Sequence, residues 1–288
     1  MGAIDRMRKL SSKINLHAKS YEPLSDYIKN ELLFLKQHGF DAADFSLNLL
    51  KPLGENWQSC IETAIEDSKK IGIPFAVCHL PYSTSICTNP DLLPPFEAQM
   101  HRAIDAAALL GADYAVLHPN TTTEPAETFS RIKQYDSVMR HLEPFAVHAQ
   151  RVGVKLAVEN MRVVHNTYPT HRYCQDPDEL CEIADALGIA VCWDFGHGHI
   201  GGVKQSDALH YIGSRLKAVH INDNTARDDD HIPPFCGTVD WKDAMQALND
   251  IGYTGLFNYE IAAQRVPNEL RDSFAAYLVQ AAKTLQSF

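Results

Sequence analysis

The sequence lacks any long hydrophobic run: in its 288 residues no apolar stretch approaches the roughly 18 residues that a membrane-spanning helix needs. Glycine and proline number only 15 each, and no Gly-, Ser- or Pro-rich linker divides the chain. The basic N-terminal segment leads directly into polar residues, and Arg6 stands where a myristoylation motif needs Ser or Thr. We therefore expect a cytoplasmic protein with one domain, residues 1–288, no signal peptide and no membrane contact.

Positive charge is also scarce, because 26 Lys and Arg stand against 36 Asp and Glu, a net charge of −10. A field of this sign repels phosphate backbones and anionic membranes, which disfavours a nucleic-acid partner. The seven cysteines include no C-x-x-C pair and are odd in number, so they indicate reduced thiols rather than a disulfide framework or a zinc ribbon.

Short segments rich in β-branched and aromatic residues alternate with longer segments of helical periodicity along the whole chain. The expected strands are Ile14–Ala18, Ala42–Ser46, Phe75–His79, Asp113–His118, Lys155–Glu159, Ala190–Asp194, Leu216–Ile221 and Gly255–Glu260. The expected helices are Leu24–His38, Asn56–Lys70, Phe96–Leu110, Thr128–Arg151, Pro177–Leu187, Ser206–Arg215, Trp241–Asn249 and Asn268–Leu285. Glycines suited to a left-handed helix end precede six strands: Gly39, Gly72, Gly111, Gly153, Gly188 and Gly252. Eight units with a mean spacing of 36 residues (288/8) predict a closed parallel barrel, the (β/α)8 TIM barrel of the α/β class.

Six of the expected strands have Asp, Glu or His at or next to their last position: His79, His118, Glu159, Asp194, His220 and Glu260. The carboxyl ends of barrel strands meet around one mouth, so we expect these side chains to converge. Burying three carboxylates there without a cation would cost several kcal/mol each, whereas a divalent metal would compensate their charge. The pattern therefore predicts a metal site with carboxylate and imidazole ligands.

Three further residues of ligand type lie just beyond the strands. His197 follows Asp194 by three residues, and we expect Gly196 and Gly198 to leave the backbone free to turn such side chains inward. In an extended loop Asp229 and His231 would point the same way, which favours a ligand role; the alternative is that Asp228-Asp229-Asp230 forms a solvated acidic loop.

These residues occur within seven short motifs: His79-Leu80-Pro81, Leu117-His118-Pro119, Val158-Glu159-Asn160-Met161, Asp194-Phe195-Gly196-His197, Val219-His220-Ile221-Asn222-Asp223-Asn224, Asp229-Asp230-His231-Ile232-Pro233-Pro234 and Asn258-Tyr259-Glu260. The ordered set resembles the sugar phosphate isomerase/epimerase superfamily, which has the xylose isomerase-like TIM barrel and includes the endonuclease IV family. The resemblance covers essentially the whole chain. It departs at Phe235-Cys236-Gly237, where many relatives have Gly-Glu-Gly, and at Asp44, where they often have Glu.

The resemblance implies a sugar or sugar-phosphate isomerase or epimerase with one divalent metal, Mn²⁺ or Zn²⁺ foremost and Co²⁺ or Fe²⁺ next. Its ligands would be Glu159, Asp194, His220 and Glu260. The metal would stabilise an enediolate, while Glu159 and Glu260 move the proton and His197 binds a substrate oxygen.

Two other chemistries fit the same ligands. A multinuclear phosphoesterase resembling endonuclease IV would use His79, His118 and Glu159 for one metal, the four core ligands for a second, and His197, Asp229 and His231 for a third. The net charge and Phe195-Gly196, where that family typically has Thr-Cys, argue against DNA as its substrate. A dehydratase or lyase would need further acids or bases from the loops: His17, Lys19, Arg162, His165, His171, Arg172 and Arg227. A barrel that had lost catalysis and only bound a sugar would be expected to lack some ligands, and none is missing here.

The segment Met161–Tyr173 mixes aromatic, His and Arg side chains and is a candidate recognition loop. Arg162 or Arg172 could bind a substrate phosphate or carboxylate, or either could be an ordinary surface arginine. The expected partners are a small-molecule sugar or sugar phosphate and further copies of the chain, associated through the outer helices as a homo-oligomer.

Overall fold

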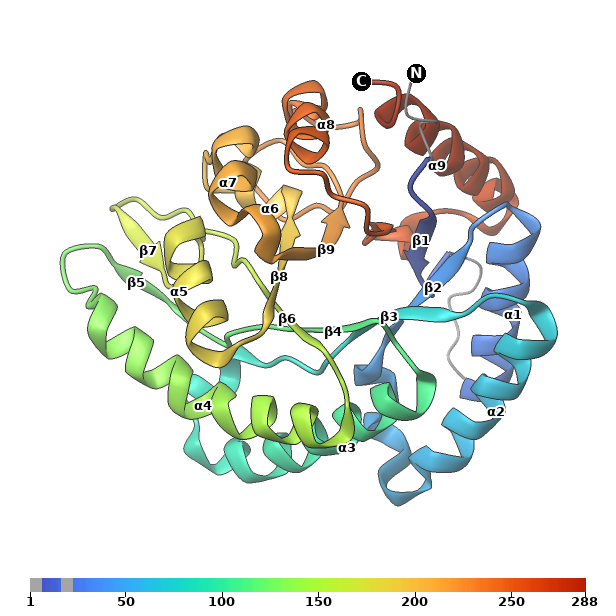
Figure 1. Ribbon diagram of the computed structural model, residues 1–288, viewed down its shortest axis with the longest axis horizontal. Helices are drawn as coiled ribbons and strands as arrows, with labels where there is room; N and C mark the ends of the chain where they lie inside the picture. The colour runs from blue at the N-terminus through green and yellow to red at the C-terminus, as the bar shows by residue number, and fades with distance from the viewer. Residues whose placement is uncertain (1–6, 17–22) are drawn as a thin grey trace.

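The computed structural model describes residues 7–16 and 23–288, and its parallel strands close into a barrel surrounded by helices (Figure 1). Neighbouring strands follow the order β1-β10-β9-β8-β6-β4-β3-β2 around the barrel. Their bounds are β1 (Leu10–Lys13), β2 (Ala42–Ser46), β3 (Phe75–His79), β4 (Tyr114–Leu117), β6 (Leu156–Glu159), β8 (Ala190–Asp194), β9 (Leu216–Ile221) and β10 (Phe257–Tyr259). The predicted TIM barrel is confirmed.

The helices lie outside the barrel, and the expected ones are found within a few residues of their predicted bounds. They are α1 (Leu24–Gln37), α2 (Trp57–Ile71), α3 (Leu93–Leu110), α4 (Arg131–Val152), α5 (Pro177–Leu187), α7 (Gln205–Ile212), α8 (Trp241–Asp250) and α9 (Arg271–Leu285). The six predicted helix-ending glycines all have a positive φ, between 64° and 85°. Within the described residues, no helix combines the length and apolar character that crossing a bilayer requires.

A layer of small and apolar side chains fills the barrel interior beneath the strand ends. It consists of Val77, Val116, Ala157, Cys192 and Ala218. Each of these residues precedes a candidate ligand by two positions; four of the ligands are on the same strand, and His118 directly follows β4. Because side chains alternate across a strand, the ligand that follows must also point inward. The larger apolar core lies between the strands and the helices, so both faces of the sheet are buried.

The expected first strand, Ile14–Ala18, was placed wrongly. The strand is β1, Leu10–Lys13, which pairs with β2 through Ser11 and Ala42 and with β10 through Leu10 and Phe257. Two consecutive serines carry little strand propensity, yet both are fully buried in the barrel, so tertiary pairing overrides the local preference. The inward-pointing residue at the end of the first strand is therefore Lys13; Ala18 lies outside the described residues.

A second, two-stranded sheet was not predicted. Strand β5 (Thr123–Pro125) follows β4 and pairs antiparallel with β7 (Thr170–Arg172), which follows β6 (Figure 1). Three residues are too few to show a periodic pattern, so the sequence predicted only a loop here. The small sheet ties together two connections at the carboxyl end of the barrel, where the candidate site lies.

Candidate active site

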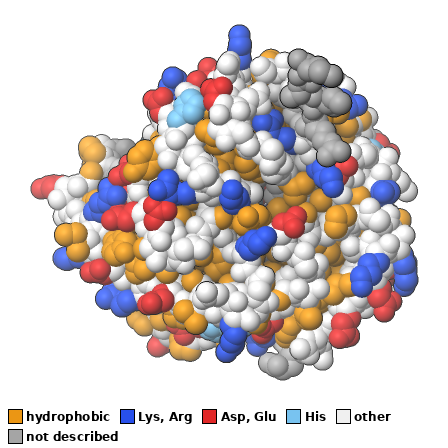
Figure 2. Space-filling view, viewed as in Figure 1, with side chains coloured by type: hydrophobic (Ala, Val, Ile, Leu, Met, Phe, Trp, Pro, Cys, Tyr) orange, Lys and Arg blue, Asp and Glu red, His pale blue; other side chains and the backbone are white. Residues whose placement is uncertain are grey.

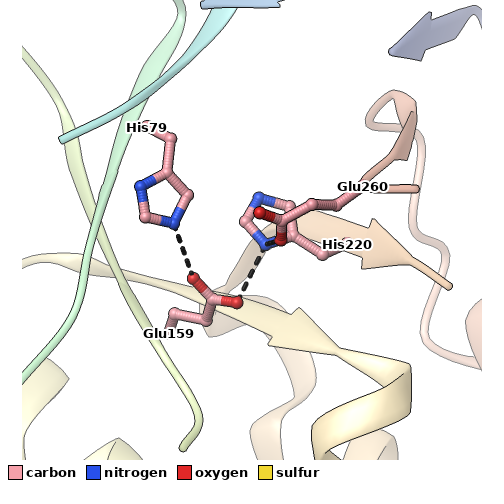
Figure 3. A group of neighbouring side chains, drawn as sticks. All are labelled: His79, Glu159, His220 and Glu260. Atoms are coloured by element: carbon pink, nitrogen blue, oxygen red, sulfur yellow. Dashed lines mark hydrogen bonds and ion pairs between the residues drawn. The ribbon is translucent and has the colours of Figure 1, made fainter. Parts of the chain in front are cut away.

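The strand-end residues meet around Glu159, which is completely buried. One carboxylate oxygen, Oε2, lies 3.3 Å from His79 Nε2 and 3.0 Å from His118 Nε2. The other oxygen, Oε1, lies 2.9 Å from His220 Nδ1 (Figure 3). Side chains from β3, from β9 and from the residue after β4 thus converge on one carboxylate of β6.

Glu260 is the second carboxylate that contacts His220. Its Oε2 lies 2.9 Å from the same Nδ1 that faces Glu159, so one imidazole nitrogen lies between two carboxylates (Figure 3). The Oε1 of Glu260 is 3.1 Å from Lys13 Nζ. Lys13 was not among the predicted site residues, because the first strand begins four residues earlier than expected.

Asp194 is fixed by two asparagines that were not singled out as functional. Its backbone N–H donates to Asn160 Oδ1 at 2.6 Å, and Asn222 Nδ2 donates to its Oδ2 at 2.7 Å. The other oxygen, Oδ1, accepts the backbone N–H of His197 at 2.7 Å and so caps the short helix α6 (Phe195–Ile200). Each asparagine directly follows or lies two residues beyond a strand-end ligand in the sequence, which is the only signal that could have identified it.

Asp229 joins the two remaining histidines. Its Oδ2 is 3.5 Å from His197 Nε2, and its Oδ1 is 3.2 Å from His231 Nε2. Arg162 contributes an ion pair, with Nε 3.3 Å from Oδ2. All nine residues of ligand type that the sequence analysis named therefore gather at the carboxyl end of the barrel.

The glycines beside His197 serve close packing rather than backbone freedom, contrary to expectation. Neither has a positive φ. A Cβ on Gly196 would lie 1.9 Å from Asn222 Oδ1, and one on Gly198 would lie 2.5 Å from the Trp193 ring. Only glycine lets α6 approach β9 closely enough for Asn222 to reach Asp194.

Three histidines have their Nδ1 atom committed to a backbone carbonyl, each at 2.8 Å: His79 to Leu80, His197 to Asn160 and His231 to Glu260. A carbonyl only accepts, so Nδ1 carries the proton and Nε2 of the neutral ring presents a lone pair. In each case that lone pair faces a carboxylate, an arrangement that repels unless a proton or a metal ion lies between the two groups. Orientation of imidazole by a carbonyl on its far nitrogen is typical of metal ligands.

The pKa values of the site residues also reflect the crowding of carboxylates and imidazoles. Burial alone would raise the pKa of Glu159, but His220 and His118 hold it well below its usual range. Burial raises the pKa of Asp194. Burial would lower the pKa of His197, yet Asp194 and Asp229 raise it to about 10, and the pKa of His231 rises to about 9 against burial because of Asp229 and Glu260. Protons on these histidines compensate carboxylates that a divalent cation would also compensate.

A divalent metal fits these residues on their chemistry. Ligand atoms lie within 4.8 Å of one another in four overlapping groups: His79, Glu159, His220 and Glu260; Glu159, Asp194 and His197; Asp194, His231 and Glu260; His197, Asp229 and His231. Buried His220 Nε2 and Asn222 Oδ1 have no partner in the described part of the chain, which leaves the site unsatisfied as it stands. Mixed carboxylate and imidazole ligation suits Mn²⁺, Zn²⁺, Co²⁺ or Fe²⁺.

The additional acids and bases expected from the loops do not form one group. His165 and Arg227 are exposed, His171 pairs with Glu179 at 2.9 Å, and Arg172 is buried beside Thr121. His17 and Lys19 lie outside the described residues. Tyr82, which the sequence analysis did not select, stacks on His118 with ring centroids 4.5 Å apart and is half exposed, so it borders the site.

Comparison with known proteins identifies the family. Residues 32–280 match the family described as xylose isomerase-like TIM barrel, and the chain belongs to it. An inosose isomerase of Bacillus licheniformis is 26% identical over 164 residues, 55% of this chain and 57% of that protein. A probable endonuclease 4 of Thermoplasma acidophilum is 26% identical over 188 residues, 60% of this chain and 62% of that protein. The chain spans about half the length of two further curated relatives that it matches, and at most 73% of the length of any of the five.

Solved structures share the fold. The D-psicose 3-epimerase of Clostridium cellulolyticum H10 superimposes with a TM-score of 0.74 at 15% identity, covering 96% of this chain and 99% of that one. At this identity the likeness establishes the barrel and its topology. A shared fold does not fix the reaction, which depends on the residues of the site.

Proposed function

We propose that the protein is a divalent-metal-dependent isomerase or epimerase acting on a sugar or sugar phosphate. The observation that carries the proposal is the position of His220 Nδ1, 2.9 Å from both Glu159 and Glu260. Two carboxylates thus share one imidazole nitrogen, so a sugar bound beside His220 would lie within reach of both. The isomerase and epimerase named above support the same reaction class by analogy.

Glu159, Asp194, His220 and Glu260 would hold the metal. When bound, the ion would draw electron density from the carbonyl and hydroxyl oxygens of an open-chain sugar, which makes the neighbouring C–H more acidic. Mn²⁺ or Zn²⁺ is the ion that we expect first.

The proton moves between the sugar and the two glutamates. One glutamate, in its ionised form, removes the proton from the carbon beside the carbonyl, and the electrons of that C–H bond shift toward the oxygens to give an enediolate. The other glutamate enters the step carrying a proton taken from solvent and donates it to the enediolate, either at the same carbon (epimerisation) or at the former carbonyl carbon (isomerisation). The first glutamate then releases its proton to solvent. Lys13 holds Glu260 in its ionised form: against the effect of burial, Lys13 and His220 keep the pKa of Glu260 well below its usual range. His197, with Nδ1 held by the Asn160 carbonyl, would bind a substrate oxygen through Nε2.

Solvent hydrogen exchange tests this proposal. Metal-loaded protein in D2O is incubated with a panel of ketoses, and deuterium at the carbon next to the carbonyl is followed by NMR. We expect incorporation by the wild type, at least about 100-fold slower incorporation by Glu159→Gln and by Glu260→Gln, and no change in the exposed control Glu66→Gln. If both active-site variants exchange at the wild-type rate, the proton-transfer assignment is wrong. An enone product would indicate the dehydratase alternative.

A multinuclear phosphoesterase is the second candidate, and a specific observation favours it. His79 and His118 both face Glu159 Oε2, the oxygen that His220 does not use, while His197, Asp229 and His231 form a further group. A carboxylate with imidazoles on both oxygens can bridge two ions, and metal clusters of this kind generate hydroxide for ester hydrolysis.

Metal counting separates the two functions. Protein purified without chelator or histidine tag is analysed by plasma mass spectrometry and assayed with bis(p-nitrophenyl) phosphate, in parallel with His118→Ala. One ion per chain that survives the substitution supports the isomerase. Two or three ions, a lower count in His118→Ala and hydrolysis of the diester support the phosphoesterase.

A further inference from the structure

The two arginines of the connection after β6 differ in what their guanidinium groups contact. The side chain of Arg162 is partly exposed and pairs with Asp229, a residue of the candidate site. Arg172 is only 6% exposed and forms no ion pair with any residue that the structure describes. A buried cation without a carboxylate is costly, so Arg172 calls for a different explanation from Arg162.

The small sheet holds Arg172 firmly. Its Cα is paired with that of Thr123 across β5 and β7, and its backbone N–H donates to Gln175 Oε1 at 2.8 Å. The side chain is also anchored, because Nε donates to the Thr121 carbonyl at 3.0 Å. The guanidinium is therefore oriented before any ligand arrives.

Nη1 and Nη2 of Arg172 have no hydrogen-bond partner among residues 7–16 and 23–288. The other deeply buried arginine, Arg271, differs in this respect: its Nη1 donates to the Leu16 carbonyl and its Nη2 to the Ala263 carbonyl. The two terminal guanidinium nitrogens of Arg271 thus join parts of the chain, whereas those of Arg172 remain available to a ligand.

Arg172 lies at the same end of the barrel as the candidate site. Thr121, which holds it, follows the ligand-type residue His118 by three positions, and Arg172 itself is in the connection after Glu159. Burial and the positive charge of Arg162 lower the pKa of Arg172 to about 10, so it remains a cation at neutral pH with a second cation nearby.

We propose that Arg172 binds the phosphate group of a phosphorylated sugar through Nη1 and Nη2, which makes a sugar phosphate the substrate class of this barrel. The proposal rests on the proposed function, since it assigns the substrate of the same site. The planar guanidinium matches two oxygens of a phosphate, and Arg162, which is paired with Asp229, places a second guanidinium near it.

Calorimetric titration with matched probes tests the proposal. The full-length protein is titrated with D-fructose 6-phosphate, with D-fructose, with D-gluconate and with inorganic phosphate. We expect the two phosphates to bind, and Arg172→Met to weaken both by about 10-fold to 100-fold. Arg172→Lys, which keeps the charge without the fork, should fall between Arg172→Met and the wild type. The control Arg215→Met removes an outer-surface arginine that pairs with Asp185 and should bind as the wild type does.

Two results would overturn the proposal: phosphate affinity unchanged in both Arg172 variants, or gluconate bound as tightly as D-fructose 6-phosphate. If Arg172→Met fails to fold, as its unfolding transition would report, Arg172→Lys alone decides. The outcome is independent of turnover. Absence of deuterium exchange with any sugar would contradict the isomerase and leave phosphate binding intact, while loss of the phosphate site would leave exchange into unphosphorylated ketoses unaffected.

Discussion

The amino and carboxyl ends of the barrel differ in whether their charged side chains are exposed or buried, as single strands show. Strand β6 is preceded by exposed Lys155 and ends at buried Glu159, and β9 carries exposed Lys217 near its start and buried His220 near its end. A cavity of about 1320 Å³ opens at the amino end, lined in part by both lysines. The view in Figure 2 shows Lys and Arg side chains interspersed with hydrophobic ones around the centre of one face.

The difference teaches that compensated charge, rather than empty volume, marks the chemical site. The lysines at the amino end remain solvated and need no partner. At the carboxyl end, Glu159 and Asp194 are completely buried and depend on histidines, asparagine amides and N–H groups for compensation. Only such a site gains free energy from a bound cation.

The largest expected effect comes from comparing the two ends of β9. His220→Asn removes the nitrogen between Glu159 and Glu260, and we expect metal affinity to fall at least about 100-fold because two carboxylates lose their shared partner. Lys217→Gln, three residues earlier, should bind metal as the wild type does. Titration with Mn²⁺ and Zn²⁺ measures both, and circular dichroism verifies that each variant is folded. Equal metal affinity in the two folded variants would mean that the carboxyl end of the barrel does not hold the metal.

A smaller effect is expected from close packing at the carboxyl end. Gly196→Ala places a methyl group 1.9 Å from Asn222 Oδ1, so Asn222 must move and Asp194 loses its amide donor. We expect the free energy of unfolding to fall by about 1–3 kcal/mol. Gly201→Ala is the matched control, because its φ is −69° and its nearest new contact is 3.4 Å. Denaturant unfolding of both variants gives the comparison, and equal stability would mean that α6 can shift away from β9 at little cost.

The sequence could predict the barrel and its strand-end ligands because both depend on short-range periodicity. The two-residue alternation that buries Ala157 also turns Glu159 inward, and this rule needs no knowledge of loops. It failed for Lys13 only because the serines of β1 hid the strand. Once β1 is placed at Leu10–Lys13, the same rule brings Lys13 into the mouth beside Glu260.

Other features depend on contacts between distant segments. Asn222 holds Asp194 only because α6 lies close to β9, which follows from Gly196. The burial and orientation of the Arg172 side chain depend on pairing between β5 and β7, two segments of three residues each. No local pattern distinguishes Arg172 from Arg162, so their different partners become apparent only in three dimensions.

Acid should weaken a buried histidine that supports the carboxyl end. His141 on α4 accepts a hydrogen bond from Asn120 Nδ2 at 3.1 Å, and Asn120 Oδ1 in turn accepts the Ser83 N–H, so this histidine supports two connections at the carboxyl end. Burial lowers the pKa of His141 to about 4 from its ordinary value of 6.5. The unfolded chain therefore binds the proton more readily than the folded chain does. The contribution of His141 to the free energy of unfolding is fully present above pH 6.5 and is lost as the pH falls toward 4.

We expect this histidine to account for about 1–2 kcal/mol of the loss between these pH values, allowing for partial solvation. His141→Phe keeps the ring contacts with Phe96 and Phe145 and removes the titrating group. Its unfolding free energy should therefore depend less on pH in this range, although the Asn120 hydrogen bond is lost at neutral pH. A pH dependence identical to that of the wild type would assign the acid sensitivity to other groups.

The smallest effect is expected at the amino end. Lys155 lies over the Tyr114 ring, with Nζ 5.6 Å from its centroid, and is otherwise exposed. Lys155→Met keeps the length of the side chain and removes the charge, so the unfolding free energy should fall by no more than about 0.5–1 kcal/mol. Metal content and deuterium exchange should not change, because Lys155 and Glu159 lie at opposite ends of β6. A loss of metal or turnover in this folded variant would mean that the lysine-lined cavity takes part in the chemistry, and the separation of the barrel into a reactive and an inert end would fail.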